Sequence, residues 1–422
     1  MTEATNKNKI PAHWQVKKLG EVCKLKNGYA FKSDKYENVG VPVIRISDIN
    51  GGIVSSQKAV RVNPNDEYDN YLVENNDILV AMSGATTGKF GVYKSTEKAY
   101  QNQRVGKFKI LDESILNNEF LYHQINSLKR QIEKDAYGGA QPNISSTKIE
   151  QMQIVVPTLT EQQAIVAKIE ELLSELDNGK QQLLTAQQQL KVYRQSLLKW
   201  AFEGKLTNNN VKDGELPEGW KVVKSGDVID NINSGKSYRC NERPPNDSEV
   251  GIIKVSSVTW GHFDEMESKT CFSNDLFNEK YQIKEGDFLF SRANTLDFIG
   301  ACVIVNSIGK NLMLSDKILR FTFTKAILKE FALHYLRSKK GRTQIEFLST
   351  GNQDSMRNIG QEKIKQIEIP LPPLKEQQQI VEELESKLTV CDKIEETISQ
   401  SLLQAETLKQ SILKKAFEGR LV

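Results

Sequence analysis

The sequence predicts an α+β protein in which two similar globular domains are separated by two long helices. We expect these helices to form an antiparallel coiled coil, and the whole chain to have pseudo-two-fold symmetry. The first observation is a repeat, since residues 161–206 return without a gap as residues 376–421 with 18 of 46 positions identical. The second is the helical pattern of both copies, and the third is the series of short β-type runs before each copy.

The repeat continues upstream in short matches. His13-Trp14 corresponds to Gly219-Trp220 at an offset of 206, and Asn143-Ile144 corresponds to Asn358-Ile359 at an offset of 215. Because the offset only grows along the chain, the halves share one architecture with small insertions. We predict a first globular domain over 1–156, a helix over 157–206, a second globular domain over 207–371 and a second helix over 372–422.

Each repeated segment has the pattern of a long helix with one narrow apolar seam. Proline precedes both copies, Thr160 with Gln163 forms a candidate capping box, and Gly204 and Gly419 are natural helix stops. The apolar residues recur alternately three and four positions apart, which is typical of a coiled coil. The residues predicted to pair the helices are Ile169, Leu172, Leu176, Leu183 and Leu190 in the first copy and Leu384, Ile394, Ile398 and Leu408 in the second. The alternative is that each helix packs only on its own domain.

The segments before the helices contain short runs of strand-forming residues between Gly-, Asn- and Ser-rich loops. The predicted strands are Val41–Ile46, Asp77–Met82, Val105–Ile110, Gly251–Val255, Phe288–Ser291 and Ile318–Phe323. Helices are predicted over Asn118–Asp135 and Ala326–Phe347. Each segment should therefore form a compact domain with both helices and strands.

Composition limits the class of protein. The net charge is only +3, five cysteines are scattered without a CxxC pair, and no apolar stretch has the length of a membrane span. We therefore expect a cytoplasmic protein with reduced thiols and no metal site. The weak basic excess indicates that any nucleic acid is bound by locally clustered cations or together with a partner.

Motifs of catalysis are missing from the sequence. The run Gly84–Lys89 has three residues between its glycines and Phe90 after its lysine, so it does not match a phosphate-binding loop. Arg243–Asn246 resembles an adenine methyltransferase tetrad with the wrong first residue, and four histidines without metal spacing provide no basis for a hydrolytic site. We predict no catalytic residues.

The order of divergent domain, Glu-Gln-Gln helix, second divergent domain and second helix resembles the DNA specificity subunit of type I restriction-modification systems. The resemblance covers essentially the whole chain. It rests on Pro11–Trp14 with Leu19–Val22, Pro217–Trp220, Gly138–Ser145, Pro157–Val166, Pro372–Val381 and the two AFEG[KR]L endings. The second half departs from the pattern at Gly351–Ile359, where the Gln-Pro-Asn motif is replaced.

The resemblance implies a non-catalytic subunit whose two target recognition domains each read one half of a split, asymmetric site in double-stranded DNA. It also implies that the helices dock two modification subunits, which bind S-adenosylmethionine and methylate adenine. Two restriction subunits, which use ATP and Mg²⁺, would complete the complex. The chain itself is then expected to hold no cofactor.

For DNA contacts we select polar side chains at corresponding strand ends and loops of the two halves, since Lys and Arg contact phosphates and Arg, Asn and Gln read base edges. They are Arg45, Lys89, Gln103 and Arg104 in the first domain, and Lys254, Arg292, Asn294 and Lys317 in the second. The loops Lys24–Tyr36 and Ser234–Arg239 are further candidates. Two other classes stay open, a stand-alone DNA-binding or architectural protein and a complete enzyme with an unrecognised site.

Overall fold

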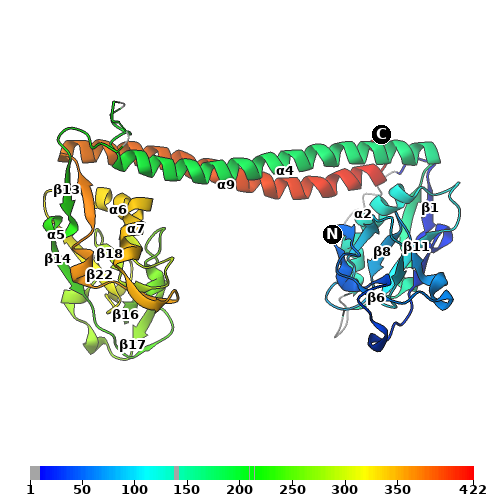
Figure 1. The fold of residues 1–422 in the computed structure, drawn as a ribbon, viewed down its shortest axis with the longest axis horizontal. Coiled ribbons are helices and arrows are strands. Elements are labelled where there is room, and N and C mark those ends of the chain that lie inside the picture. Colours follow the sequence, from blue (N-terminus) through cyan, green and yellow to red (C-terminus); the bar gives the residue numbers. More distant parts are fainter. Residues whose placement is uncertain (1–9, 137–141, 209, 213) are drawn as a thin grey trace, which may run out of the picture. The chain divides into compact units, whose positions relative to one another are not determined.

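The computed structural model describes residues 10–136, 142–208, 210–212 and 214–422 (Figure 1). It divides into two compact units. Unit 1 combines the chain up to Leu183 with Gln400–Val422, and unit 2 is Leu184–Ser399. Each unit contains one globular part, called head 1 (residues 10–158) and head 2 (residues 214–373) below, together with a segment of each long helix.

Head 1 is an α+β domain with three sheets. Its sheets have the strand orders β1-β12, β6-β3-β10-β7 and β2-β11-β8-β9-β5-β4. The strands are β1 (Gln15–Lys18), β2 (Cys23–Asn27), β3 (Val41–Ile44), β4 (Ile49–Asn50), β5 (Gly52–Val54), β6 (Val60–Val62), β7 (Leu72–Val73), β8 (Ile78–Ala81), β9 (Phe90–Tyr93), β10 (Ala99–Gln101), β11 (Val105–Ile110) and β12 (Gln153–Val156). The helices are α1 (Leu19–Val22), α2 (Asn118–Ala136) and α3 (Ser146–Glu150).

Head 2 repeats this architecture and adds a fourth sheet of three short strands. Its strand orders are β13-β25, β14-β22-β18-β20, β15-β17-β16-β21 and β19-β24-β23. The strands are β13 (Lys221–Lys224), β14 (Ile229–Ser234), β15 (Cys240–Asn241), β16 (Val250–Ile253), β17 (Ser268–Cys271), β18 (Phe288–Ser291), β19 (Ala293–Asn294), β20 (Cys302–Ile304), β21 (Asn311–Met313), β22 (Ile318–Phe323), β23 (Thr350–Gln353), β24 (Met356–Asn358) and β25 (Glu368–Leu371). The helices are α5 (Ser225–Val228), α6 (Lys329–Arg337), α7 (Lys339–Leu348) and α8 (Gln361–Ile364).

The central strands β11 and β22 demonstrate the internal duplication at the level of side chains. Their sequences, VGKFKI and ILRFTF, have the same order of buried and exposed positions. The third residue of each strand is a cation, and it forms an ion pair with the aspartate that directly precedes the neighbouring strand, β8 or β18. Lys107 Nζ lies 3.1 Å from Asp77 Oδ2, and Arg320 Nη1 lies 3.0 Å from Asp287 Oδ2. The two heads are therefore versions of one fold, as the sequence predicts.

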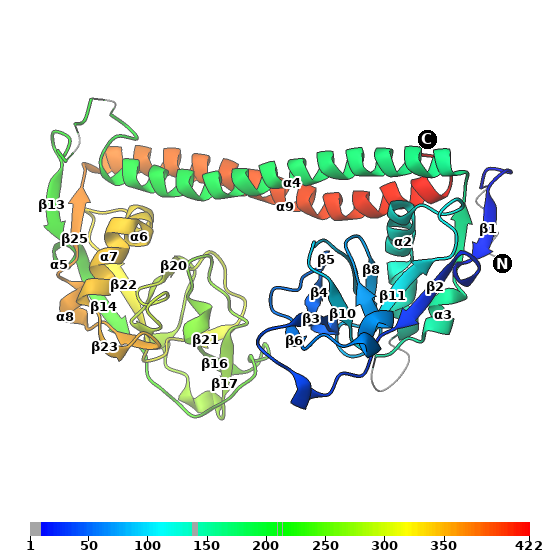
Figure 2. The same cartoon turned by 45° about the vertical axis from the view of Figure 1, so that its right-hand side comes forward.

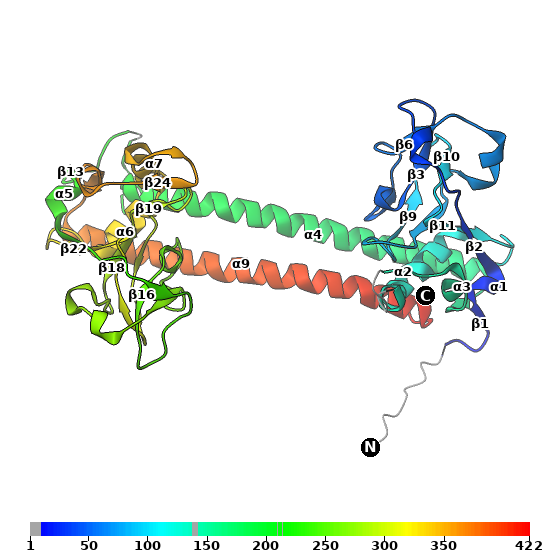
Figure 3. The same cartoon turned by 90° about the horizontal axis from the view of Figure 1, so that it is seen from below.

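The long helices are α4 (Leu159–Phe202) and α9 (Leu374–Phe417), each of 44 residues. In both units a segment of α4 runs beside a segment of α9 (Figures 1 and 3). In unit 1, Ile169 shares a buried cluster with Leu413, and Lys180, further along α4, forms an ion pair with the earlier Glu406 of α9. The paired segments are therefore antiparallel, as predicted.

The predicted helix-pairing residues divide into three groups. Ile169, Leu190, Leu384 and Ile398 are buried, and Leu172, Leu176 and Leu183 are half-buried. Ile394 and Leu408 are 43% and 50% exposed, so the prediction that they belong to the seam is wrong. A heptad allows a step of three or four residues after Cys391, and Glu395, four residues on, is the one that bonds Arg194 of α4, at 3.0 Å.

Both ends of α4 are held by the residues that mark them in the sequence. The capping box forms two residues earlier than predicted, since the Thr158 hydroxyl donates to Glu161 Oε2 at 2.7 Å and accepts from the Glu161 amide. Gly204 and Gly419 end the two long helices with φ of +77° and +69°. These are left-handed conformations, which glycine adopts without strain.

The predicted helix over Ala326–Phe347 is instead two helices, α6 and α7, that meet at Ser338. The Ser338 hydroxyl accepts the amide of Gly341 as the N-cap of α7. A Cβ on Gly341 would lie 2.3 Å from the carbonyl oxygen of Tyr335, so this tight turn needs glycine. None of the helices among the described residues is long and apolar enough to cross a membrane.

Candidate nucleic-acid interface

Each head contains a pair of parallel strands, and the loops that follow these two strands lie at one edge of their sheet (Figure 2). In head 1, β3 and β10 are parallel, with Val43 beside Tyr100 and Ile44 beside Gln101. In head 2, β16 and β21 are parallel, with Ile252 beside Met313. Because parallel strands end at the same edge, the residues that follow them lie close together. This edge brings Arg45 toward the loop 102–104, and Lys254 toward the loop 314–317.

Backbone hydrogen bonds then join three loops in the same way in both heads. The Met82 amide donates to Arg104 O at 2.9 Å, and the Arg292 amide donates to Lys317 O at 3.0 Å. The Ile144 amide donates to Met82 O at 3.0 Å, and the Ile359 amide donates to Arg292 O at 2.9 Å. Arg104 and Lys317 are therefore equivalent, and so are Met82 and Arg292.

A glycine in each head permits a close approach behind this edge. A Cβ on Gly28 would lie 2.2 Å from the carbonyl oxygen of Gln101, and one on Gly235 would lie 1.8 Å from that of Leu314. Only glycine fits at either position without a shift of backbone. A loop starts at each of these glycines and is thus held against the connection β10–β11 in head 1 or β21–β22 in head 2. The two loops belong to the predicted segments Lys24–Tyr36 and Ser234–Arg239. Gly28 and Gly235 can be found in the sequence, but the close backbone contact that requires glycine there cannot.

The four predicted residues of head 1 lie on this edge in different settings. Lys89, Gln103 and Arg104 are exposed, whereas the Arg45 side chain is 35% exposed and its Nε lies 3.6 Å from Asp48 Oδ2. Backbone bonds connect their segments, from the Asn102 amide to Ile44 O at 3.0 Å and from the Ala81 amide to Lys89 O at 2.8 Å.

The segment that follows α2 in head 1 also reaches this edge. Pro142 O accepts hydrogen bonds from the Gly84 amide and the Thr87 hydroxyl, both at 3.0 Å. Of the motif Gly138–Ser145, residues 138–141 lie outside the described residues. In head 2 the segment Gly351–Ile359, where the Gln-Pro-Asn motif is replaced, forms most of the hairpin β23–β24. Strand β24 pairs with β19.

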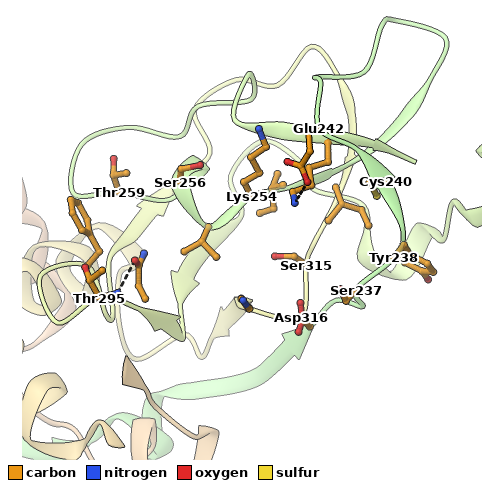
Figure 4. Close-up of a pocket in the computed structure, with 17 residues that line it drawn as sticks. Ser237, Tyr238, Cys240, Glu242, Lys254, Ser256, Thr259, Thr295, Ser315 and Asp316 are labelled. Atoms are coloured by element: carbon orange, nitrogen blue, oxygen red, sulfur yellow. Dashed lines mark hydrogen bonds and ion pairs between the residues drawn. The ribbon is translucent and has the colours of Figure 1, made fainter. Parts of the chain in front are cut away.

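In head 2 the structure brings three of the four predicted residues together. Lys254, Asn294 and Lys317, from three separate segments, line one cavity of about 770 Å³. Figure 4 shows Lys254 among the residues of its wall. Arg292 does not line it, although its backbone is bonded to Lys317 at the rim. The other lining residues are mostly polar side chains and short apolar ones, namely Ser237, Tyr238, Cys240, Glu242, Ile252, Ile253, Val255, Ser256, Thr259, Lys269, Thr295, Phe298, Ser315 and Asp316.

Lys269 and Glu242 are residues of this cavity that sequence reasoning missed. Lys269 Nζ lies 2.5 Å from Glu242 Oε1, and this hydrogen bond holds the pKa of the Glu242 carboxyl below its usual value. Nothing in the short segment SKTC of β17 distinguishes Lys269 from an ordinary exposed lysine. The cavity thus has three lysines and two carboxylates among its lining residues, a slight positive excess that suits an anionic ligand with polar edges.

Comparison with protein families then identifies the chain. A family model described as the type I restriction modification DNA specificity domain matches residues 11–186 and again residues 217–404. The chain belongs to this family. Each match begins in one head and ends in the long helix that follows it, and the resemblance predicted from the sequence motifs is confirmed. The protein is therefore a DNA-recognition subunit of the type I restriction-modification class.

Individual relatives agree with the family. The chain is 27% identical over 425 residues to the specificity subunit of the type I restriction enzyme EcoKI from Escherichia coli, covering 98% of this chain and 90% of the relative. Among solved structures, a chain from a study of complex assembly and conformational transition of the type I R-M system matches with a TM-score of 0.73 at 20% identity, covering 98% and 99% of the two chains. The HsdS subunit from Thermoanaerobacter tengcongensis matches with a TM-score of 0.61 at 19% identity, covering 98% and 99%. These structural matches support the fold.

Proposed function

We propose that this specificity subunit reads a bipartite, asymmetric site in double-stranded DNA, one half with each head. The observation that favours this reading is the mixture of shared and different residues at equivalent positions of the two edges. Arg45 and Lys254 both follow the first parallel strand, and Arg104 and Lys317 both precede the central strand. Cations kept at equivalent positions suit contacts to the phosphate backbone, which is the same in every sequence.

Other equivalent positions differ between the heads, as base-reading residues would. Gln103 of head 1 corresponds to Asp316 of head 2, since each precedes one of the equivalent cations. The half-buried Arg292 of head 2 stands where head 1 has Met82, which is buried in its core. Different side chains at one position of the same fold suit the reading of different bases. Lys89 and Asn294, which have no like residue in the other head, belong to this second group in our proposal.

We further propose that the chain itself is non-catalytic and docks two methyltransferase subunits and two restriction subunits in the cytoplasm. S-adenosylmethionine, ATP and Mg²⁺ would be bound by these partners. Exposed apolar side chains on the long helices support a docking role, because Val192, Tyr193 and Trp200 of α4 are 55%, 41% and 40% exposed. Such side chains clustered on one element are typical of a protein-binding surface. The domain boundaries at residues 156, 206 and 371 are likewise kept as predictions.

The experiment is methylome sequencing of cells with and without this gene. The expected result is the loss of adenine methylation at one bipartite motif when the gene is deleted. An unchanged adenine methylome in cells with active partner subunits would contradict the proposal. Tight, specific DNA binding by the isolated chain together with an unchanged methylome would favour the alternative of a stand-alone DNA-binding protein.

A further inference from the structure

Two cysteines of head 2 face each other across neighbouring strands. Cys240 of β15 lies directly opposite Cys271 of β17 in the antiparallel ladder, and their Sγ atoms are 3.9 Å apart. Directly opposed residues of such a ladder have Cα atoms about 4.5–5.5 Å apart, which lies within the range that a disulfide spans. Both thiols are free in this structure. Bond formation therefore requires a closer approach of the sulfur atoms by about 2 Å and no change of strand register.

The two thiols differ in access. Cys240 is half-buried and lines the cavity that contains Lys254, Asn294 and Lys317 (Figure 4), whereas Cys271 is only 6% exposed. Burial, together with the neighbouring Cys240, raises the pKa of the Cys271 thiol. An oxidant dissolved in water therefore reaches Cys240 first. The remaining cysteines, Cys23, Cys302 and Cys391, are all buried.

We propose that Cys240 and Cys271 form a reversible disulfide under peroxide and that this bond regulates DNA reading by head 2. The Cys240 sulfur attacks one oxygen of hydrogen peroxide, the O–O bond breaks, and one water leaves with formation of a sulfenic acid. The Cys271 sulfur then attacks the Cys240 sulfur, the S–O bond breaks, and a second water leaves. In balance, two thiols and one hydrogen peroxide give one disulfide and two waters, and the two electrons lost by sulfur reduce the peroxide.

The bond would act on the cavity through β15. This strand has only two residues and directly follows the segment that contributes Ser237 and Tyr238 to the cavity wall. A link to β17 fixes that wall against the sheet and prevents it from adjusting to a bound ligand. This regulatory step rests on the proposed function, because it assumes that the cavity contacts DNA. We expect oxidation to weaken binding to the target duplex roughly fivefold.

Disulfide formation is tested on the full chain without DNA. The protein is treated with hydrogen peroxide in its native state, free thiols are blocked, and the digest is analysed by mass spectrometry with and without a reductant. The expected result is one cross-linked peptide pair containing Cys240 and Cys271, two hydrogens lighter than the reduced pair and released by the reductant. The variant Cys240→Ser should not form it, whereas Cys391→Ala, which removes a buried thiol elsewhere in unit 2, should form it normally. Absence of the cross-link in the folded wild type, or its formation in Cys240→Ser, would overturn the proposal.

Regulation is tested with the complete complex and the bipartite duplex identified by methylome sequencing. Wild type should bind this duplex roughly fivefold more weakly after peroxide and recover with reductant, while Cys240→Ser should bind equally before and after. Equal binding by cross-linked and reduced wild type would overturn the regulatory step. Failure of the reduced complex to bind any methylated bipartite motif would instead contradict the proposed function, and the mass measurement would still decide whether the thiols react.

Discussion

Gln162 accepts a hydrogen bond from the backbone amide of Asn117 at 2.8 Å, and this bond ties the first turn of α4 to the loop that leads into α2. The same amide side chain donates to Ile115 O at 2.8 Å and to Pro157 O at 2.9 Å. Gln377 makes the equivalent three bonds in unit 2, to the amide of Leu328 and to the carbonyls of Ala326 and Pro372. Both glutamines are fully buried. The first Gln of the repeated Glu-Gln-Gln motif therefore joins head and helix in both units.

Replacement of Gln162 by Leu should destabilise unit 1 by about 3 kcal/mol. Leucine has a similar volume but leaves the Asn117 amide and the Ile115 and Pro157 carbonyls without this partner, and a polar group left unpaired on burial costs about 1–3 kcal/mol. The measurement is denaturant unfolding followed by circular dichroism. Gln163→Leu is the matched control, because Gln163 is the exposed neighbour on the same helix and its loss should change the unfolding free energy by less than about 0.5 kcal/mol. Equal stability of the two variants would show that the buried bonds do not hold the junction.

The observed burial along α9 predicts unequal losses of stability for the same substitution at two nearby positions. Ile398→Ala should cost about 2–4 kcal/mol, because Ile398 is 5% exposed and its removal leaves a cavity in the seam. Ile394→Ala should cost less than about 1 kcal/mol, because that side chain is 43% exposed. Thermal unfolding of both variants under the same conditions measures the difference. A larger loss for Ile394→Ala would restore the register predicted from the sequence.

The register error has a physical cause in the residues of the seam. The apolar pattern around Cys391 permits either Ile394 or the charged Glu395 to face α4, and sequence reasoning chose the apolar side chain. In the structure Ile394 is 43% exposed, and Arg194 of α4 bonds both Asp392, at 2.7 Å, and Glu395, at 3.0 Å. A polar pair between helices can fix the register of a coiled coil, but the partner on a distant helix is not visible in a local pattern.

Three strands with local signals were predicted to the residue and β3, β8 and β16 to within two residues at each end, whereas the cavity of head 2, which depends on distant contacts, was not predicted. The boundaries of β11, β18 and β22 match the predicted strands because β-branched and aromatic residues continue over each of them. In contrast, the cavity of head 2 is assembled from elements between 237 and 317 in the chain, so Lys269 and Glu242 could not be found from neighbours in sequence. Comparison of corresponding positions in the two halves selected Lys254, Asn294 and Lys317, which the structure places in this cavity.

Burial of His123 should make unit 1 sensitive to acid. This side chain is 5% exposed, and burial, with a smaller effect of Lys409 on α9, lowers its pKa to about 4. At a pH between the folded pKa of about 4 and the unfolded pKa of about 6.5, His123 binds a proton in the unfolded chain but not in the folded chain. Stability is therefore lost as the pH falls through this window, by up to about 3 kcal/mol.

The variant His123→Leu isolates this contribution. Below pH 6.5 the wild type should lose stability more steeply than the variant, and the two curves should run parallel above pH 7. Denaturant unfolding at a series of pH values between 4.5 and 8 measures both. The equivalent residue of unit 2, His334, also has a lowered pKa through burial, opposed by Glu385, and it is present in both proteins, so it cancels in the comparison. Parallel curves over the entire range would exclude His123 as the acid-sensitive group.

Alanine variants of the candidate interface should separate phosphate contacts from base reading. Arg104→Ala and Lys317→Ala should weaken binding of the complex to all duplexes alike and reduce the slope of log affinity against log salt by about 1 each, because a lost phosphate contact releases one counterion fewer. Arg292→Ala should instead cost about 1–3 kcal/mol at the target and relax one base position in one half-site. Fluorescence anisotropy with a set of single-base variants of the bipartite duplex distinguishes the two patterns. Lys129→Ala is a suitable control, since Lys129 is an exposed lysine on α2 paired with Glu133 rather than on the edge. If alanine at both Arg45 and Arg292 leaves affinity and sequence preference unchanged, neither the phosphate contact of Arg45 nor the base contact of Arg292 exists, and the loops that start at Gly28 and Gly235 become the next candidates.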